Sequence, residues 1–266
     1  MGRDGADGCT LTRPTANTIL CTGKLRGGDY CIDGSVSSQF ITGLYFALPL
    51  IGEKYTLQIT GKLESKPYVD MTRNAIERFG FPNSKCPEIT EVEGDWSNGA
   101  FFLAAAALGN HVTVTNLHSE SAQGDREAAS LLPALKEMIT IDASDIPDLV
   151  PILSVVAAVN QGAVFTNVRR LRLKESDRVK TVMEMIHHLG GRAEATENTL
   201  TIHGTGLIGG CVKSYNDHRI AMATAIAATV CTEPVMICGA EAVNKSYPKF
   251  WDEYRRLGGN YEQYLR

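Results

Sequence analysis

Apolar and polar residues alternate along this chain with two different periodicities. Short runs that are continuously apolar, or that alternate with polar residues, predict strands, whereas apolar residues spaced three and four apart predict helices. The predicted strands span residues 19–22, 30–33, 55–60, 89–92, 112–115, 162–168, 200–203 and 235–238. The predicted helices begin at or near Val36, Pro67, Phe101, Ala128, Leu149, Arg178 and Asp217. Residues 1–17 show neither periodicity, and we expect them to be irregular.

This alternation of strand and helix predicts an α/β (α+β) fold that uses a β-α-β-α-β-β unit several times. Charged and hydroxyl residues gather at the turns where a strand gives way to a helix. Free backbone N–H groups and the helix dipole favour anions at such turns. The pattern therefore predicts that anions bind at strand-to-helix turns.

The most charged of these turns runs from Lys174 to Arg178, where four of five residues carry a charge. Lysine and arginine at this place can bind phosphate or carboxylate, and Glu175 can carry a proton. A solvated charge run that opens an amphipathic helix is the simpler interpretation. Taken alone, the run favours that simpler interpretation.

A second polar turn holds Ser35, Ser37, Ser38 and Gln39 at the start of a predicted helix. One serine would be enough to cap the helix. Three hydroxyls and an amide exceed that need, so we favour an oxyanion site at this turn.

Composition limits the class of protein. The 266 residues, 44% of them hydrophobic, can form one large domain or two modest ones. A net charge of −4 gives no reason to expect a nucleic-acid or membrane partner. Seven cysteines without a C-x-x-C pair disfavour a zinc site and indicate reduced thiols. The longest apolar runs are too short to span a bilayer, and the N-terminus has no signal pattern. We expect a cytoplasmic protein, or an organellar one whose targeting segment is absent.

Five polar stretches occur in an order that is known from one enzyme family. They are DGSVSSQF at 33–40, SKPY at 65–68, KESDR at 174–178, YNDHR at 215–219 and KSYP at 245–248. In this order they resemble the 5-enolpyruvylshikimate-3-phosphate (EPSP) synthases, also called 3-phosphoshikimate 1-carboxyvinyltransferases. The resemblance extends from about Leu25 to Trp251.

The resemblance implies two lobes of three β-α-β-α-β-β units each, with helices inside, sheets outside and the substrates between the lobes. Residues 1–90 would form an incomplete lobe for the shikimate phosphate, and residues 91–266 a lobe carrying the phosphoenolpyruvate cradle. The family transfers the enolpyruvyl group of phosphoenolpyruvate to the 5-hydroxyl of shikimate 3-phosphate and releases phosphate. This reaction of the shikimate pathway leads to chorismate and the aromatic amino acids, and it needs no metal or organic cofactor. Glyphosate inhibits the family; the sensitivity of this chain is left open.

The resemblance also implies roles for individual residues. The proton carriers would be Asp148 and Glu175, with His218 adjusting Glu175. The shikimate 3-phosphate ligands would be Ser37, Ser38, Gln39, Ser65, Tyr68, Asp148, Arg170 and Lys174. The phosphoenolpyruvate ligands would be Gln39, Arg178, Arg219 and Lys245.

Local structural roles compete with some of these assignments. Asp148 and Asp217 each stand before an apolar helix, where an aspartate is a common cap. Arg170 lies where many relatives have asparagine or another arginine. Trp96 and Trp251 are assigned to packing.

Two features depart from the family pattern. The family has roughly another half-lobe before the first matching stretch, with a phosphate-binding Lys-Ser…Arg segment, a Gly-rich stretch and a further arginine. The links after Phe79 and Met138 are also short. We therefore expect this chain by itself to show at most trace synthase activity.

Two rival functions remain open. The sister enzyme that transfers enolpyruvate to UDP-N-acetylglucosamine shares the chemistry but uses a catalytic cysteine in a mobile loop, and no cysteine here has such a setting. A non-catalytic remnant that binds a phosphorylated ligand is the rival of another class. Steady-state phosphate release with both substrates separates these functions.

Overall fold

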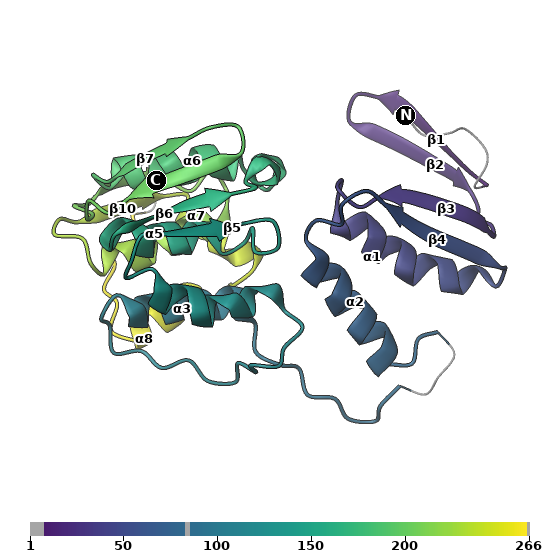
Figure 1. Ribbon diagram of the computed structural model, residues 1–266, viewed down its shortest axis with the longest axis horizontal. Coiled ribbons are helices and arrows are strands. Elements are labelled where there is room, and N and C mark those ends of the chain that lie inside the picture. Colours follow the sequence, from purple (N-terminus) through teal and green to yellow (C-terminus); the bar gives the residue numbers. More distant parts are fainter. Residues whose placement is uncertain (1–7, 83–85, 265–266) are drawn as a thin grey trace. The chain divides into compact units, whose positions relative to one another are not determined.

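The computed structural model describes residues 8–82 and 86–264. The chain divides into two compact units, Met1–Thr90 and Glu91–Arg266 (Figure 1). A pair of parallel strands with two helices forms the centre of the first unit. A four-stranded sheet, a second parallel pair and several buried helices form the second unit.

The first unit contains two small sheets. One is an antiparallel hairpin, and the other is a parallel pair whose strands are joined through a helix. Hydroxyl groups of Thr42 and Thr72, 2.8 Å apart, join the two helices of this unit. The elements in chain order are β1 (Cys9–Thr15), β2 (Thr18–Gly23), β3 (Gly28–Asp33), α1 (Ser38–Ala47), η1 (Leu48–Ile51), β4 (Tyr55–Thr60) and α2 (Lys66–Arg78).

The expectation that residues 1–17 are irregular is wrong for Cys9–Thr15, which forms β1. Residues 1–7 lie outside the described part. Both strands of the hairpin are exposed along almost their whole length, so neither face needs to be apolar. Antiparallel backbone pairing, which begins at Cys9 and Gly23, holds the two strands together. No buried apolar face is needed for this.

The second unit contains a mixed sheet with strand order β5-β6-β8-β7 and a separate parallel pair, β9 and β10. Its helices and 3-10 helices are α3 (Trp96–Ala107), η2 (Gly124–Glu127), α4 (Ala128–Ala134), α5 (Val150–Val159), η3 (Arg169–Leu173), α6 (Arg178–His188), α7 (His218–Ala228), η4 (Ala240–Lys245) and α8 (Phe250–Arg256). Its strands are β5 (Ile139–Asp142), β6 (Gly162–Thr166), β7 (Arg192–Ala195), β8 (Thr199–His203), β9 (Gly210–Lys213) and β10 (Val235–Cys238).

Helices α5 and α7 lie in the core of the second unit. Nine of the ten residues of α5 and ten of the eleven residues of α7 are buried. A helix that is apolar on all sides is stable only when other elements surround it. The remaining core comes from α3, α6 and the strands, so helices fill the interior of this unit.

Three parallel strand pairs are each connected through a helix: β3-α1-β4, β5-α5-β6 and β9-α7-β10. A further α-helix follows the second strand of every pair, namely α2, α6 or α8. These three copies confirm the predicted α/β fold and its repetition. In parallel pairs the carboxyl ends of both strands lie at one edge, which places the following helix starts near each other.

Some predicted elements are absent or different. Residues 89–92 and 112–115 are described but form no strand. Ile89 and Val92 are 90% and 82% exposed, so their apolar side chains pack on nothing that would hold a strand. The helix predicted to begin at Ala128 is short: α4 ends at Ala134, after Pro133, and β5 begins at Ile139.

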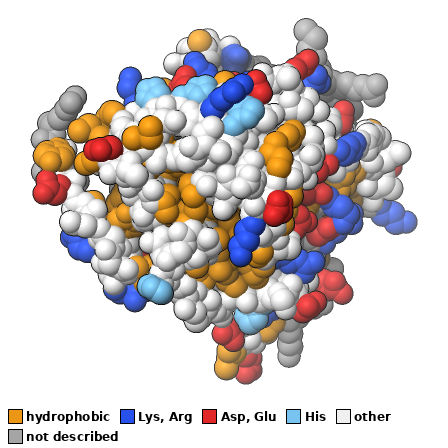
Figure 2. Space-filling view, turned by 60° about the vertical axis from the view of Figure 1, so that its left-hand side comes forward, with side chains coloured by type: hydrophobic (Ala, Val, Ile, Leu, Met, Phe, Trp, Pro, Cys, Tyr) orange, Lys and Arg blue, Asp and Glu red, His pale blue; other side chains and the backbone are white. Residues whose placement is uncertain are grey.

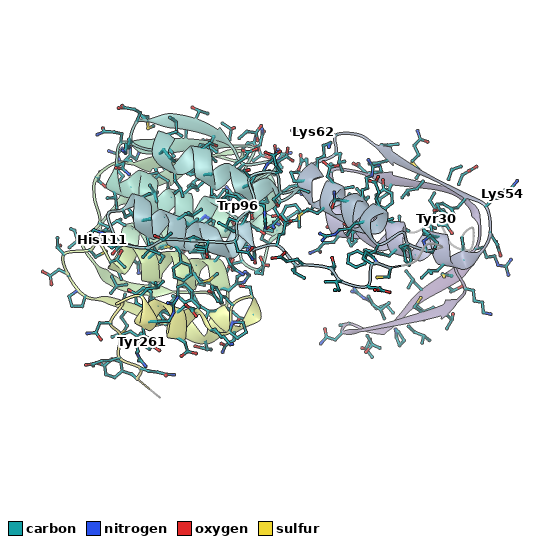
Figure 3. All side chains as sticks on the ribbon, turned by 90° about the horizontal axis from the view of Figure 1, so that it is seen from below. Tyr30, Lys54, Lys62, Trp96, His111 and Tyr261 are labelled. Atoms are coloured by element: carbon teal, nitrogen blue, oxygen red, sulfur yellow. The ribbon has the colours of Figure 1, made fainter. Side chains whose placement is uncertain are left out.

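No helix in 8–82 or 86–264 is long and apolar enough to cross a membrane. Lysine and arginine side chains occur beside aspartate and glutamate on the face seen in Figure 2, in keeping with the small net charge. Trp96 begins α3 and lies within the second unit in Figure 3, with its indole Nε1 donating to the carbonyl of His118. This contact fits the packing role predicted for Trp96.

Candidate active site

Two copies of the repeat in the second unit bring six charged residues together. They come from the turns before α5, α6 and α7 and from the first two residues of α6 or α7, although up to 71 positions separate contacting residues in the sequence. This charge cluster consists of Asp148, Lys174, Glu175, Arg178, Asp217 and Arg219.

Arg178, the first residue of α6, lies at the centre of the charge cluster and is fully buried. Its Nη1 donates to Asp148 Oδ1 at 2.5 Å, its Nη2 to Glu175 Oε2 at 2.5 Å, and its Nε to Asp217 Oδ2 at 2.9 Å. Burial would lower the pKa of Arg178, but the three carboxylates raise it above its ordinary value. The guanidinium therefore remains charged and fixes three carboxylates in place.

Asp148 receives three cations. Arg178 and Arg219 approach different oxygens at 2.5 and 3.0 Å, and the Nζ of Lys174 lies 3.7 Å from Oδ1. Burial would raise the pKa of Asp148, but Arg219, Lys174 and Arg178 together bring it well below its usual range. Asp148 is therefore an ionised acceptor in this state.

Asp217 has both a capping role and a role in the charge cluster. Oδ1 accepts from the backbone N–H of Arg219 at 3.0 Å, which confirms Asp217 as the cap of α7. Oδ2 accepts from Arg178 and from the hydroxyl of Ser176 at 2.9 Å. Burial opposes ionisation of this carboxyl, but Arg178 and the hydrogen bonds lower its pKa.

His218 lies between these charges and is 6% exposed. Burial and then Arg219 lower its pKa, although Asp217 and Glu175 act in the opposite direction. The ring is therefore neutral near pH 7, and its electrostatic interaction with Glu175 agrees with the proximity that the resemblance implies. Its Nδ1 is buried and has no hydrogen-bond partner in the described part of the chain.

Arg219 has buried donors that the described residues do not satisfy. Its Nη2 binds Asp148, while Nε and Nη1 are buried and have no hydrogen-bond partner among residues 8–82 and 86–264. A buried donor without a partner costs about 1–3 kcal/mol, and more when it is charged. Such groups are typical of sites that a ligand or ordered water completes. Arg219 therefore keeps two donors that no described residue satisfies.

Lys245 ends η4 and lies beside the turn that carries Asp217. Its Nζ donates to the carbonyl of Asn216 at 2.6 Å, and the side chain is exposed. Tyr215 and Asn216 both have positive φ, 54° and 59°, a conformation that non-glycine residues adopt only where the surroundings hold it. This tight turn positions Asp217, His218 and Arg219 at the start of α7.

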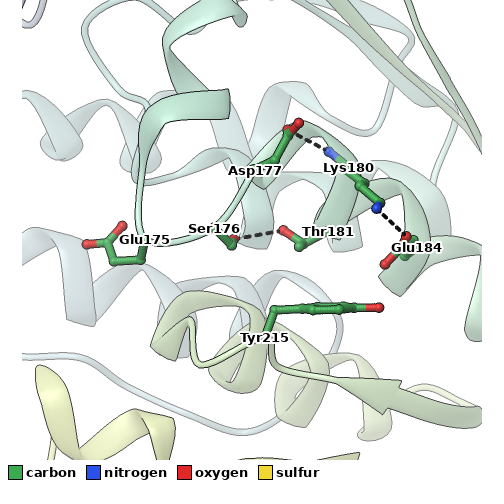
Figure 4. A pocket seen from close by; sticks show the side chains of 7 residues that line it. All are labelled: Glu175, Ser176, Asp177, Lys180, Thr181, Glu184 and Tyr215. Atoms are coloured by element: carbon green, nitrogen blue, oxygen red, sulfur yellow. Dashed lines mark hydrogen bonds and ion pairs between the residues drawn. The ribbon is translucent and has the colours of Figure 1, made fainter. Parts of the chain in front are cut away.

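A hollow of about 320 Å³ adjoins the charge cluster (Figure 4). It lies between the start of α6 and the turn before α7. Its lining residues are Glu175, Ser176, Asp177, Lys180, Thr181, Glu184 and Tyr215. The side chain of Glu175 is 40% exposed, so it is the carboxylate of the charge cluster most accessible to a substrate.

The remaining predicted residues lie elsewhere. Ser37 caps α1 and accepts from the backbone N–H of Gln39 at 3.3 Å, so the simple capping role holds for this serine. Ser38 is buried, and Gln39 is exposed. Ser65, with φ of 54°, precedes the helix that contains Tyr68.

Arg170 is half-buried in η3, which belongs to the second unit. The ligand roles of Ser37, Ser38, Gln39, Ser65, Tyr68 and Arg170 remain predictions.

The sequence model of the family "EPSP synthase (3-phosphoshikimate 1-carboxyvinyltransferase)" matches this chain at residues 11–139 and 131–254. The chain belongs to the EPSP synthase family. The match includes the turns of the charge cluster and the serine turn before α1. It confirms the resemblance that the five polar stretches predict.

Curated relatives and solved structures agree with this family. The 3-phosphoshikimate 1-carboxyvinyltransferases of Clostridium kluyveri and Clostridium novyi are 41% and 40% identical over 92% and 91% of this chain. An EPSP synthase structure from Acinetobacter baumannii has a TM-score of 0.74 at 20% identity, with coverage of 96% of this chain and 68% of that chain. The enolpyruvyl transferase NikO from Streptomyces tendae has a TM-score of 0.63 at 13% identity, with coverage of 96% and 69%. Both structures share the fold.

This chain spans 66% and 63% of the lengths of the two clostridial EPSP synthase relatives. The structure therefore describes about two thirds of what those relatives contain. The charge cluster around Arg178 belongs entirely to the second unit, Glu91–Arg266.

Asp125, a residue of η2, is a buried carboxylate that the sequence motifs of the EPSP synthase family did not indicate. Asp125 is 5% exposed, and its Oδ1 has no hydrogen-bond partner within the described ranges. Burial and then the charge of Asp148 raise the pKa of Asp125 to about 6. A polar G-D-R-E sequence gives no sign of this burial, which comes from packing between distant elements.

Asp125→Asn is expected to stabilise the second unit at pH 8. The raised pKa means that the folded state keeps a proton that the unfolded state loses, so stability falls as pH rises between about 4 and 6. A shift from 3.8 to about 6 lowers the free energy of unfolding at pH 8 by about 3 kcal/mol. The asparagine variant has no such carboxyl and should not show this loss. Urea unfolding of both proteins at pH 4.5 and pH 8 measures the difference.

The exposed Asp252 on α8 supplies the matched control, Asp252→Asn. The difference in stability between the two aspartate variants should be about 3 kcal/mol at pH 8 and only about 1 kcal/mol at pH 4.5. An Asp125→Asn variant that is less stable than the unsubstituted chain at pH 8 would show that the ionised Asp125 supports the fold.

Proposed function

We propose that this chain carries the phosphoenolpyruvate part of an EPSP synthase site, together with a portion of the shikimate 3-phosphate part. The reaction transfers the enolpyruvyl group of phosphoenolpyruvate to the 5-hydroxyl of shikimate 3-phosphate and releases phosphate. The observation that carries the proposal is the pair of buried, unsatisfied nitrogens of Arg219, beside a carboxylate cluster that can exchange protons. Membership of the family agrees with it.

Binding of phosphoenolpyruvate would use the cations of the second unit. Arg219 offers two donors, and Lys245 is exposed beside the same turn. Arginine and lysine suit the phosphate and carboxylate of this substrate. Arg178 is fully occupied by three carboxylates, so its main contribution is to hold them, and it would contact the substrate only if one of them moved.

Addition of the hydroxyl to phosphoenolpyruvate requires two proton movements. The methylene carbon gains a proton while the hydroxyl oxygen, as it bonds to the neighbouring carbon, loses one. Glu175 is the accessible proton carrier, and Asp148 is the ionised acceptor. Loss of phosphate from the resulting tetrahedral intermediate and return of one methyl proton complete the transfer.

Substrate binding would also change Asp148. Its low pKa depends mainly on Arg219, followed by Lys174 and Arg178. Substrate anions that draw Arg219 and Lys174 away would weaken this effect and raise the pKa of Asp148. The carboxylate would then become a better base at the moment when the hydroxyl is in place.

Arg219→Gln is expected to weaken phosphoenolpyruvate binding by roughly 10–10²-fold, because each hydrogen bond to a charged group contributes about 1.5–3 kcal/mol. Calorimetric titration of phosphoenolpyruvate into the chain, with shikimate 3-phosphate present, measures this change. Arg255→Gln is the control, since Arg255 is an exposed residue of α8 whose guanidinium lies 4.3 Å from the ring centre of Tyr261. Equal affinities of the unsubstituted chain and the Arg219 variant would remove Arg219 from the site.

The wider assignment follows from this reaction. The chain would serve the shikimate pathway, and a cytoplasmic location suits its water-soluble phosphorylated substrates. If the site binds glyphosate, we expect glyphosate to compete with phosphoenolpyruvate for it.

A further inference from the structure

The outer face of the β9–β10 pair carries three sulfur atoms. Cys211 lies opposite Met236 in the parallel register, and Cys238 follows two positions later on the same face of β10. All three side chains are exposed, Met236 by 53%. The Sγ atoms of Cys211 and Cys238 are 3.7 Å apart.

This separation suits a shared metal ion better than a disulfide bond. A disulfide requires about 2.05 Å between the sulfur atoms. Two thiolates bound tetrahedrally to one cation, each at about 2.3 Å, lie about 3.8 Å apart. The observed 3.7 Å matches the second geometry without movement of either strand.

The backbone around the two thiols is held firmly. The Cys238 carbonyl accepts from the Ser214 N–H at 2.9 Å, and the Ser214 hydroxyl donates to Gly239 O at 2.8 Å. His188 Nδ1 lies 2.7 Å from the carbonyl oxygen of Cys211. These bonds connect both ends of the pair to neighbouring elements, so the backbone that carries the two thiols is held in place.

We propose that Cys211 and Cys238 form a two-thiolate site for a soft, thiophilic metal cation, with the Met236 thioether alongside. On binding, each thiol loses its proton to water and its sulfur donates an electron pair to the metal. No group of three or more His, Cys, Asp or Glu residues with the geometry of a metal site occurs in 8–82 and 86–264. Water or Met236 therefore completes the coordination.

The charges next to the site favour soft metals over hard ones. Lys213 lies opposite Cys238 in the register, and His188 adjoins Cys211. Neither basic group attracts a hard dication such as Mg²⁺, which also prefers oxygen ligands. Affinity must come from sulfur, and thiolate with thioether is the ligand set that soft metals prefer.

Cadmium is the probe for this site, because Cd²⁺ bound to thiolate has an ultraviolet charge-transfer band. Anaerobic titration of the reduced chain should give this band at one equivalent of Cd²⁺, and Mg²⁺ should give none. Cys211→Ser and Cys238→Ser should each weaken Cd²⁺ binding at least about 10²-fold. Even the loss of a residue that only hydrogen-bonds to a metal ligand weakens metal binding about 10–100-fold. Cys21→Ser and Cys31→Ser, at exposed cysteines of the first unit, should bind like the unsubstituted chain.

A second measurement uses the unsubstituted chain only. One equivalent of Cd²⁺ should protect Cys211 and Cys238 from alkylation, as read by peptide mass spectrometry, while Cys21 and Cys31 remain reactive. The proposal is overturned by a charge-transfer band that persists in both serine variants. It is equally overturned if Cd²⁺ protects neither Cys211 nor Cys238.

Discussion

Replacing Glu175 by glutamine is expected to lower turnover by about 10²–10⁴, the range for loss of a general acid–base group. Glutamine keeps the size of the side chain and can still accept a hydrogen bond from Arg178, so the charge cluster should stay assembled. Binding of shikimate 3-phosphate should change little, because the lost function is the transferable proton.

The assay for Glu175→Gln requires measurable transfer by the unsubstituted protein. Phosphate release is therefore followed with the chain mixed with an N-terminal segment of the Clostridium kluyveri relative, because the family resemblance implies that such a segment carries further cations. Glu197→Gln is the control, since Glu197 is an exposed glutamate that pairs with Arg169 outside the charge cluster. A Glu175 variant with more than half of the unsubstituted rate would exclude Glu175 from proton transfer.

Arg178→Met is expected to destabilise the second unit by about 3–5 kcal/mol, the usual cost when one partner of a buried ion pair is removed. Methionine has a similar length but no charge, so Asp217, which is fully buried, would lose its neutralising partner. Asp148 would keep Arg219 and Lys174, which limits the loss.

Tryptophan fluorescence reports this change selectively. The two tryptophans of the chain, Trp96 and Trp251, both belong to the second unit. Urea unfolding followed by their emission should show the loss for Arg178→Met. Arg169→Met removes an exposed ion pair and should cost less than about 1 kcal/mol. Equal midpoints for the two variants would mean that the cluster around Arg178 contributes little to the fold.

The sequence predicted those strands and helices whose apolar residues have a clear periodicity and whose first residue is marked by a turn or a capping residue. Residues 55–60 and 235–238 form strands with the predicted bounds, and Asp217 caps the predicted apolar helix. The failures lie where pairing decides the structure. The exposed strand β1 has no apolar face, and the alternating residues 112–115 form no strand.

The candidate site could be predicted in part. Position in the family pattern indicated every charged residue of the cluster except Asp217, which the sequence suggested only as a helix cap. Sequence spacing does not encode contacts between copies of the repeat. The bonds that join Arg178 to Asp148 and Asp217, 30 and 39 positions away, arise from the packing of α5, α6 and α7. For the same reason the burial of Asp125 was not foreseen.

The most direct test of the proposed function is ³¹P NMR of phosphoenolpyruvate and shikimate 3-phosphate incubated with the purified chain, with and without the complementing N-terminal segment. The account predicts at most trace conversion by the chain alone. With the segment, it predicts equal amounts of free phosphate and enolpyruvyl product. Robust conversion by the chain alone would contradict the need for further cations. Absence of product in the mixture, while each substrate binds, would contradict enolpyruvyl transfer itself.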